Sequence, residues 1–237
     1  MGRLTPPAAP VAFFDVDETL VAMKSPFALL RYRLREQGDR DGSAYRAKAD
    51  PIRRFAAQGG APAEASAMFY RALAGVPWSE LLRQGRDWYR ELHGRGVPFV
   101  EATLRALRHH QSRGHLTVAV SGAWPASLRP LADDLGFDQV LCTQPEVDRA
   151  GLLTGRIERA MFGPAKGAAV RAVLAAQGAA AGECFAYADD PSDLDMLRLV
   201  GRPAVVGDHP VLAGMAAEHG WQVLSGALVP GAERIPV

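Results

Sequence analysis

The first hydrophobic run of the chain, Val11–Phe14, is short and continuous, and acidic residues follow it directly. Three prolines precede it, at positions 6, 7 and 10. A short apolar run that contains β-branched and aromatic residues and is bounded by such breaks predicts a buried strand. We therefore expect the first strand of the fold here, with charged groups at its carboxyl end.

From Lys24 to about Pro98 the apolar positions recur every three or four residues between Gly and Pro breaks, and no strand pattern is evident. This spacing predicts helices. Their expected ranges are 26–37, 42–58, 62–73 and 77–92. A helical block of this size is typical of a small subdomain. We expect a helical cap at residues 23–97 and a core made of residues 1–22 and 98–237.

After Pro98 apolar runs that predict strands alternate with helical patterns. The expected strands are 115–120, 139–142, 184–188, 203–206 and 221–224, with an irregular excursion or small hairpin at 143–160. The expected helices are 100–113, 125–135, 164–177, 191–199 and 210–219. This alternation favours an α/β fold, a doubly wound parallel sheet with helices on both faces. The helical block is then an insertion after the first strand.

Charge and composition exclude some function classes. The chain has 237 residues, 48% of them hydrophobic, and 27 basic against 26 acidic side chains leave a formal charge of +1. This balance gives no support for nucleic-acid or membrane-surface binding as the main activity. No run approaches the length of a membrane span, and the first residues lack a signal-peptide layout. We expect a soluble, cytoplasmic protein, either a monomer or a homodimer.

Several residues fit structural roles better than chemical ones. Cys142 and Cys184 lie in or beside apolar runs and are expected to be reduced core thiols. Three histidines near a helix end are expected to cap it or to be solvated; they are His109, His110 and His115. Three arginines of the first helix are expected to be mostly solvated; they are Arg31, Arg33 and Arg35. The aromatic residues expected to fill the cap core are Phe69, Tyr70, Trp78, Trp88 and Tyr89.

Three predicted strands end in polar residues, in the segments FFDVD, AVSG and AYADD. Because ligands of open parallel sheets bind at the carboxyl ends of the strands, we expect these polar residues at one edge of the sheet. They are Asp15, Asp17, Ser121, Gly122, Asp189 and Asp190. Clustered carboxylates need cations, and oxygen ligands with positions left for water favour Mg²⁺. Lys166, near the start of the helix at 164–177, would face an anion together with free backbone N–H groups.

The order of these segments carries a family resemblance. DVDET, VSG, a lysine at a helix start (GPAKG) and DDPSD resemble the four motifs of the haloacid dehalogenase (HAD) superfamily of phosphohydrolases. More narrowly, the chain resembles the phosphoserine-phosphatase-like branch, subfamily IB, whose helical cap is inserted between the first two motifs. The similarity extends over residues 11–225. The resemblance implies a Rossmann-like core with an inserted cap.

The resemblance also implies how the acidic residues act. Asp15 would be the nucleophile that forms an aspartyl-phosphate, and Asp17 would be the general acid and then the general base. Mg²⁺ would be held by a carboxylate oxygen of Asp15, the backbone carbonyl of Asp17 and the carboxylate of Asp189. The cofactor implied is therefore Mg²⁺.

The same resemblance implies a phosphate-binding group. Ser121, the N–H of Gly122 and Lys166 would bind the phosphoryl oxygens and stabilise the charge that develops there. Asp193 would orient either the waters of the metal or the Lys166 side chain.

Two positions depart from the common family pattern. Asp190 stands where a small neutral residue is frequent, so either Asp189 or Asp190 could be the main metal ligand, and the spacing to Asp193 favours Asp189. Glu18 replaces a common glycine, and we expect it to point away from the metal because alternate residues of an extended chain face opposite sides. The alternative is that it faces the cap. Thr19 is expected to fix the turn after the strand by hydrogen bonding.

The function that the resemblance implies is Mg²⁺-dependent hydrolysis of a small phosphorylated metabolite, with phosphoserine or a related amino-alcohol or sugar phosphate as candidates. Closure of the cap over the site would favour small phosphate esters over proteins or polynucleotides as substrates. Three alternatives stay open. They are a dehalogenase of the same fold, a phosphotransferase of the same fold and a non-catalytic protein that binds phosphoesters.

Overall fold

Six parallel strands form the central sheet of the computed structural model, which describes residues 9–235. The strand order is β3-β2-β1-β6-β7-β8. The strands are β1 (Val11–Phe14), β2 (Leu116–Ser121), β3 (Gln139–Cys142), β6 (Phe185–Ala188), β7 (Arg202–Val206) and β8 (Gln222–Leu224). All of the expected strands form, with ends that differ from the expected ones by at most one residue.

The order of the strands reverses beside β1. From β1 the chain builds outward through β2 and β3, then returns to the other side of β1 and builds outward again through β6, β7 and β8. In the register of the sheet, Phe14 lies between Ala119 of β2 and Tyr187 of β6. The residues that follow β1 therefore emerge at the switch point, where open α/β sheets bind their ligands.

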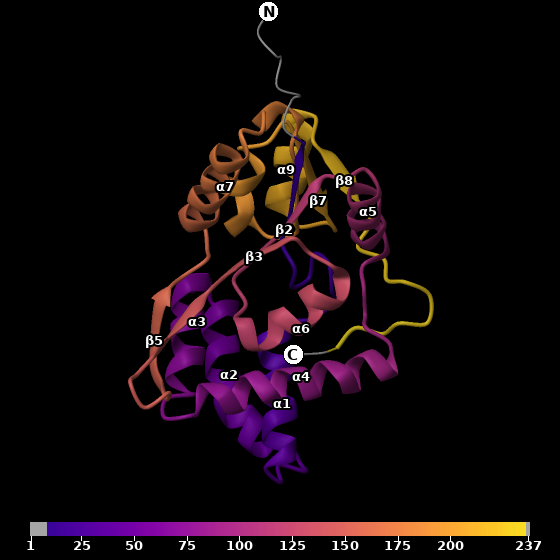
Figure 1. The fold of residues 1–237 in the computed structure, drawn as a ribbon. Helices are drawn as coiled ribbons and strands as arrows, with labels where there is room; N and C mark the ends of the chain where they lie inside the picture. The colour runs from indigo at the N-terminus through magenta and orange to yellow at the C-terminus, as the bar shows by residue number, and fades with distance from the viewer. Residues whose placement is uncertain (1–8, 236–237) are drawn as a thin grey trace, which may run out of the picture.

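Helices cover both faces of the sheet, as the alternation of patterns predicted. They are α5 (Glu101–Ser112), α6 (Pro125–Leu135), α7 (Pro164–Gln177), α8 (Leu194–Leu197) and α9 (Pro210–His219). Adjacent residues of β1 enter different cores: Phe14 packs in the cluster that contains Leu107 of α5, and Phe13 packs in the cluster that contains Val170 of α7. Figure 1 shows α5 and α7 on opposite sides of the sheet. The predicted α/β fold class is confirmed.

The four helices expected in the segment 23–97 are present as α1 (Ser25–Glu36), α2 (Ser43–Ala57), α3 (Pro62–Arg71) and α4 (Trp78–Arg95). Figure 1 shows them gathered beneath the sheet, with an antiparallel hairpin beside α3. This hairpin, β4 (Gln144–Val147) and β5 (Leu153–Arg159), is the excursion expected at 143–160. It packs closely on α3, since a Cβ added at Gly155 would lie 3.3 Å from Arg71 Cα.

The helical segment is held against α6 by close contacts. A Cβ added at Gly85 of α4 would lie only 1.8 Å from the carbonyl oxygen of Ala126 in α6, so the two helices touch through this glycine. The Tyr89 hydroxyl donates to Asp134 at 2.8 Å. Because α6 begins four residues after Ser121, this contact also supports the loop at the end of β2.

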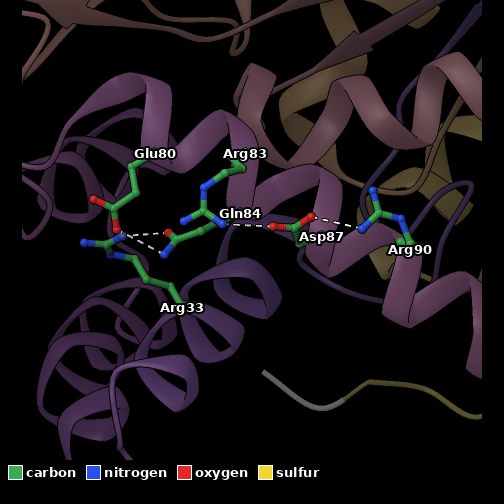
Figure 2. Close-up of polar contacts among 6 residues, drawn as sticks. All are labelled: Arg33, Glu80, Arg83, Gln84, Asp87 and Arg90. Carbon is green, nitrogen blue, oxygen red and sulfur yellow. Dashed lines mark hydrogen bonds and ion pairs between the residues drawn. The ribbon is translucent and has the colours of Figure 1, made fainter.

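The expectation that Arg33 is solvated is wrong. Only 8% of the Arg33 residue is exposed, and its Nη1 donates to Glu80 Oε1 and to Gln84 Oε1, both at 2.6 Å. Figure 2 shows this contact between α1 and α4. The cause is helix packing: the face of α1 that carries Arg33 lies against α4, whereas Arg35 lies at the surface and pairs with Glu91.

The expectation for His110 is also wrong. His110 is buried, its Nδ1 lies 2.8 Å from His115 Nδ1, and its Nε2 lies 2.8 Å from the Tyr187 hydroxyl. His109, its neighbour on α5, is exposed as expected. Packing of α5 on the sheet turns one of two adjacent histidines inward.

Other structural expectations are met. Cys142 and Cys184 are buried and unpaired. The aromatic residues expected in the cap core are buried, apart from Trp78, which is partly buried. Within residues 9–235, no helix has the length and apolar character needed to cross a membrane.

Candidate active site

A cavity of about 520 Å³ opens at the carboxyl edge of the sheet beside β1. Most of the residues singled out from the sequence line it. They are Asp15, Asp17, Ser121, Gly122, Lys166, Asp189, Asp190 and Asp193. Strands β1, β2 and β6 end at this edge and α7 begins there, so the fold brings together residues up to 178 positions apart (193 minus 15).

Lys166 lies in the first turn of α7 and is 2% exposed. Its Nζ lies 2.6 Å from Asp15 Oδ1 and 2.5 Å from Asp193 Oδ1. Burial opposes the charge on the amine, but the two carboxylates outweigh this effect and raise the pKa of Lys166 above its ordinary value. The lysine is therefore a fixed cation inside the cavity.

Three carboxylates converge around this lysine. Asp15, Asp189 and Asp193 each place one oxygen within 4.8 Å of the others. Burial, and then the charge of Asp15, raises the pKa of Asp189, and burial also raises the pKa of Asp193 although Lys166 opposes this. One lysine cannot neutralise three carboxylates, so the cluster favours a further cation. A buried set of carboxylate oxygens suits a hard divalent ion such as Mg²⁺.

Asp190, the alternative metal ligand, lies outside this cluster. Its Oδ1 accepts a hydrogen bond of 2.9 Å from the Ser192 N–H and caps the short turn Pro191–Asp193. Burial opposes the charged form, but the hydrogen bonds from Ser192 outweigh it and lower the pKa of Asp190. The geometry thus favours Asp189 over Asp190 as a metal ligand.

Thr19 does not fix the turn through its side chain, as the sequence suggested. Its hydroxyl donates to Asp189 Oδ1 at 2.5 Å, while backbone hydrogen bonds from Leu20 and Val21 to the carbonyl of Val16 close the turn. The earlier expectation is wrong because the loop after β1 lies directly beside the end of β6. Thr19 instead orients the carboxylate of Asp189.

Glu18 has a φ of +67°, in the left-handed region that glycine favours. This explains physically why glycine suits the position. Glu18 is not among the residues that line the cavity, and its carboxylate pairs with Lys24 at 2.5 Å. Lys24 does line the cavity and was missed from the sequence, although its place between the DVDET motif and the start of α1 could have indicated it.

Asp17 lines the cavity but is not a member of the three-carboxylate cluster. Its Oδ2 accepts from the Ser25 N–H at 3.0 Å, and its Oδ1 is buried without a hydrogen-bond partner in the part of the chain that the structure describes. Burial raises the pKa of Asp17 to about 7, although Lys24 opposes the shift. This carboxyl group can therefore both donate and accept a proton near neutral pH.

The loop after β2 is covered by an aromatic ring. Ser121 is fully buried, and its Oγ accepts a hydrogen bond of 3.1 Å from the Ala123 N–H. A Cβ added at Gly122 would lie 2.2 Å from the Phe162 ring, so the contact requires glycine. Phe162 also lines the cavity. Sequence reasoning missed it, although it stands four residues before Lys166.

A doubly wound parallel sheet with an acidic cavity and a buried lysine at its switch point defines the class of protein as an α/β enzyme. The sequence profile of the haloacid dehalogenase-like hydrolases matches residues 12–198. The chain belongs to this hydrolase family, which confirms the resemblance seen in the motifs.

Two relatives match the chain over different lengths. A probable phosphatase from Mycobacterium tuberculosis is 30% identical over 226 residues, which cover 94% of this chain and 78% of that protein. A Streptomyces azureus protein that is named for inhibition of morphological differentiation is 34% identical over 118 residues. That second match spans 50% of this chain and 43% of the relative.

Solved structures share the fold. A protein of unknown function from Bordetella pertussis superposes with a TM-score of 0.80 at 26% identity, over 93% of this chain and all of that one. A phosphoserine phosphatase solved as an analogue of its phospho-aspartyl intermediate gives a TM-score of 0.67 at 16% identity, over 93% of this chain and 95% of that one. At 16% identity the second likeness describes the fold alone.

Proposed function

We propose that this protein is a Mg²⁺-dependent phosphomonoester hydrolase that acts through an aspartyl-phosphate at Asp15. The observation that carries the proposal is the buried contact of Lys166 with Asp15, inside a cluster of three carboxylates at the switch point of the sheet. A carboxylate attacks an anionic phosphoryl group only where cations offset their repulsion, and this cavity gathers the groups that do so.

Asp15 is suited to be the nucleophile because Lys166 and the cluster fix its carboxylate at the cavity. Its attack on phosphorus forms the acyl-phosphate bond and breaks the ester P–O bond, and the ester oxygen leaves with the alcohol. Asp17 donates a proton to that oxygen. In the second step a water molecule attacks phosphorus, and Asp17 accepts a proton from that water. The bond between phosphorus and Asp15 breaks, which releases inorganic phosphate and restores the Asp15 carboxylate.

The phosphoryl oxygens are assigned to three groups. The Ser121 oxygen already accepts from the Ala123 N–H, which leaves its hydroxyl proton available for an anion. Gly122 has no side chain between its backbone and the cavity, and Lys166 supplies positive charge. Together they stabilise charge on the phosphoryl group as it transfers.

The carboxylates of Asp15 and Asp189 and the backbone carbonyl of Asp17 would hold Mg²⁺, with Thr19 orienting Asp189. When bound, the ion supplies neutralisation of the anionic carboxylate and phosphoryl oxygens. Asp193 holds Lys166 in place through its ion pair, and we assign it that positioning role.

Helices α1 to α4 are assigned as a cap, residues 23–97, over a core made of residues 1–22 and 98–237. Both parts line the cavity, since Phe69 and Tyr70 of α3 meet the same space as the aspartates. A cavity of this size suits a small phosphorylated metabolite. Phosphoserine, amino-alcohol phosphates and sugar phosphates are the starting candidates. The buried free cysteines suit a reducing, cytoplasmic location.

The test is phosphate release from p-nitrophenyl phosphate and a panel of metabolite phosphates, with Mg²⁺ and with EDTA. We expect turnover only with Mg²⁺, and none in Asp15→Asn. Asp133→Asn, an exposed position on α6, is the matched control and should retain the wild-type rate. Full activity of Asp15→Asn would refute the mechanism.

The same assay separates the alternatives. Halide release without metal would indicate a dehalogenase. Phosphorylated products in the presence of added alcohols would indicate a phosphotransferase. Absence of turnover on every ester would indicate a binding protein.

A further inference from the structure

The cavity that holds the aspartates extends between the helices of the cap, where its wall is mostly apolar. Three helices, α1, α2 and α3, supply this wall. Their residues in it include Phe27, Ile52, Ala56, Ala65, Phe69 and Tyr70. Phe162, on the loop before α7, adds a further aromatic ring from the core side. The space beside the phosphate site is therefore bounded largely by hydrocarbon, and the polar side chains that the cap adds to it are Lys24, Arg53 and Ser66.

Negative charge in the cavity is confined to the core. The lining carboxylates are Asp15, Asp17, Asp189, Asp190 and Asp193, all of which follow β1 or β6. Among residues 9–235, the cap adds no carboxylate to the lining. An ammonium group on the leaving alcohol would find no acidic partner at the cap wall, and burying an unpaired charge is costly.

The two cations near the cap wall already have partners. Lys24 pairs with Glu18 at 2.5 Å. The Arg53 guanidinium donates to the Tyr45 hydroxyl at 2.9 Å and to Asp50 at 3.4 Å, while its Nε is buried without a partner in the described residues. The Lys24 ammonium and both terminal nitrogens of Arg53 are thus engaged, and the Nε–H of Arg53 is the donor left for an uncharged acceptor.

We propose that the substrate is the phosphate monoester of an apolar alcohol, whose hydrocarbon chain packs between the cap wall and Phe162. The inference rests on the proposed phosphatase function and narrows its substrate class. A cavity of about 520 Å³ leaves room beside the phosphate for a group of several carbons. Phosphoserine, amino-alcohol phosphates and sugar phosphates fit this wall poorly, because the cap offers no carboxylate to an ammonium group and few polar side chains, Ser66 and Arg53 among them, to several hydroxyl groups.

The test is the dependence of kcat/KM on chain length for n-alkyl phosphates from ethyl to octyl. Each buried methylene contributes at most about 0.8 kcal/mol, which corresponds to a factor of about four. We expect kcat/KM to rise twofold to fourfold for each added methylene until the cavity is filled. Hexyl phosphate should exceed phosphoserine and glucose 6-phosphate by at least tenfold.

Two adjacent alanines at the end of α2 give a matched pair of variants. Both alanines are exposed, and Ala56 lines the cavity whereas Ala57 does not. Ala56→Asp places a charge at the exposed rim of the apolar wall and should lower kcat/KM for octyl phosphate severalfold more than for ethyl phosphate. Ala57→Asp adds the same charge to the same helix end and should leave the chain-length dependence unchanged.

The outcomes separate this inference from the proposed function. Turnover with no chain-length dependence, or with phosphoserine or a sugar phosphate preferred, would overturn the substrate class and leave the hydrolase standing. A higher kcat/KM for ω-carboxyalkyl phosphates than for alkyl phosphates would overturn the proposal that the leaving alcohol is uncharged. It would also indicate that Arg53 binds a second anionic group of the substrate.

Loss of all turnover would instead count against the proposed function. Calorimetric binding of n-alkylphosphonates with Mg²⁺ then decides the inference without catalysis. Affinity that rises with chain length supports an apolar ligand, and affinity independent of chain length overturns it.

Discussion

Lys166 and Asp15, which are 151 residues apart in the sequence, form a buried ion pair in which Nζ lies 2.6 Å from Oδ1. The pair joins the first turn of α7 to the end of the central strand. Because Lys166 also contacts Asp193, it is the positive centre around which the acidic cavity is assembled.

Replacement of this lysine should therefore impair catalysis. We expect Lys166→Met to lower kcat/KM on p-nitrophenyl phosphate by about 10²- to 10³-fold, the usual effect of removing one group that stabilises transition-state charge. Lys48→Met, on α2 and outside the cavity lining, is the control and should retain activity. An unaltered kcat/KM for Lys166→Met would remove the residue from the site.

Thr19 should control metal affinity through Asp189. Thr19→Val keeps the shape of the side chain but removes the hydrogen bond to Asp189 Oδ1. Loss of such an orienting contact typically weakens metal binding about 10- to 100-fold. Titration of activity with Mg²⁺, together with calorimetry of Mg²⁺ binding, measures the shift. Thr154→Val, on the β5 strand of the hairpin, is the control, and equal Mg²⁺ affinity in both variants would contradict the assignment.

Arg33 should contribute to folding more than the surface arginines of the same region. Arg33→Ala leaves Glu80 and Gln84 without their partner between α1 and α4 (Figure 2), and we expect it to cost about 2–3 kcal/mol of unfolding free energy. Arg90→Ala breaks an exposed pair with Asp87 and should cost less than about 0.5 kcal/mol. Urea denaturation measures the unfolding free energy of both variants. Equal losses of unfolding free energy would show that the buried contacts of Arg33 stabilise the fold no more than an exposed ion pair does.

Gly85 should set the approach of α4 to α6. In Gly85→Ala the new methyl group would overlap the Ala126 carbonyl, and we expect a loss of about 2–3 kcal/mol together with lower activity. Gly94 lies in the same helix with open space around it, so Gly94→Ala should be neutral or stabilising by up to about 1 kcal/mol. Thermal unfolding and kcat/KM are measured for both variants. A Gly85→Ala variant with wild-type stability and wild-type kcat/KM would contradict the close contact between α4 and α6.

The His110 contacts predict a specific pH dependence of stability. Burial, and then the charges of His115 and His109, lowers the pKa of His110 from 6.5 to about 4. The unfolded chain thus binds a proton more readily than the folded chain. The unfolding free energy is therefore unaffected by this group above about pH 6.5 and decreases as the pH falls toward 4, by about 3 kcal/mol in total.

The measurement is the unfolding free energy in urea at pH 7 and at pH 5, for the wild type and for His110→Gln. The variant should show a smaller difference between the two pH values. His93→Gln, at an exposed position on α4, should keep the wild-type difference. If His110→Gln shows the same difference in unfolding free energy between pH 7 and pH 5 as the wild type, His110 is not the source of the pH dependence.

The sequence alone determined the elements and the order of the site motifs. The apolar runs at 11–14 and 115–120 predicted buried strands, and polar residues at their ends predicted where the cavity would lie. This succeeded because strand and helix periodicity, and the position of ligands in parallel sheets, depend on local pattern and on general rules of topology. The division into cap and core at residues 23–97 came from the same patterns and stays a prediction.

The directions of individual side chains needed the tertiary structure. Thr19 bonds to Asp189, 170 residues away, Arg33 is buried against α4, and His110 turns toward Tyr187. Each partner comes from a distant segment, so no local spacing could reveal it. The apolar wall of the cavity, formed where α1, α2 and α3 meet Phe162, was decided in the same way. Local pattern determines which chemistry the chain carries, and long-range packing decides which groups meet.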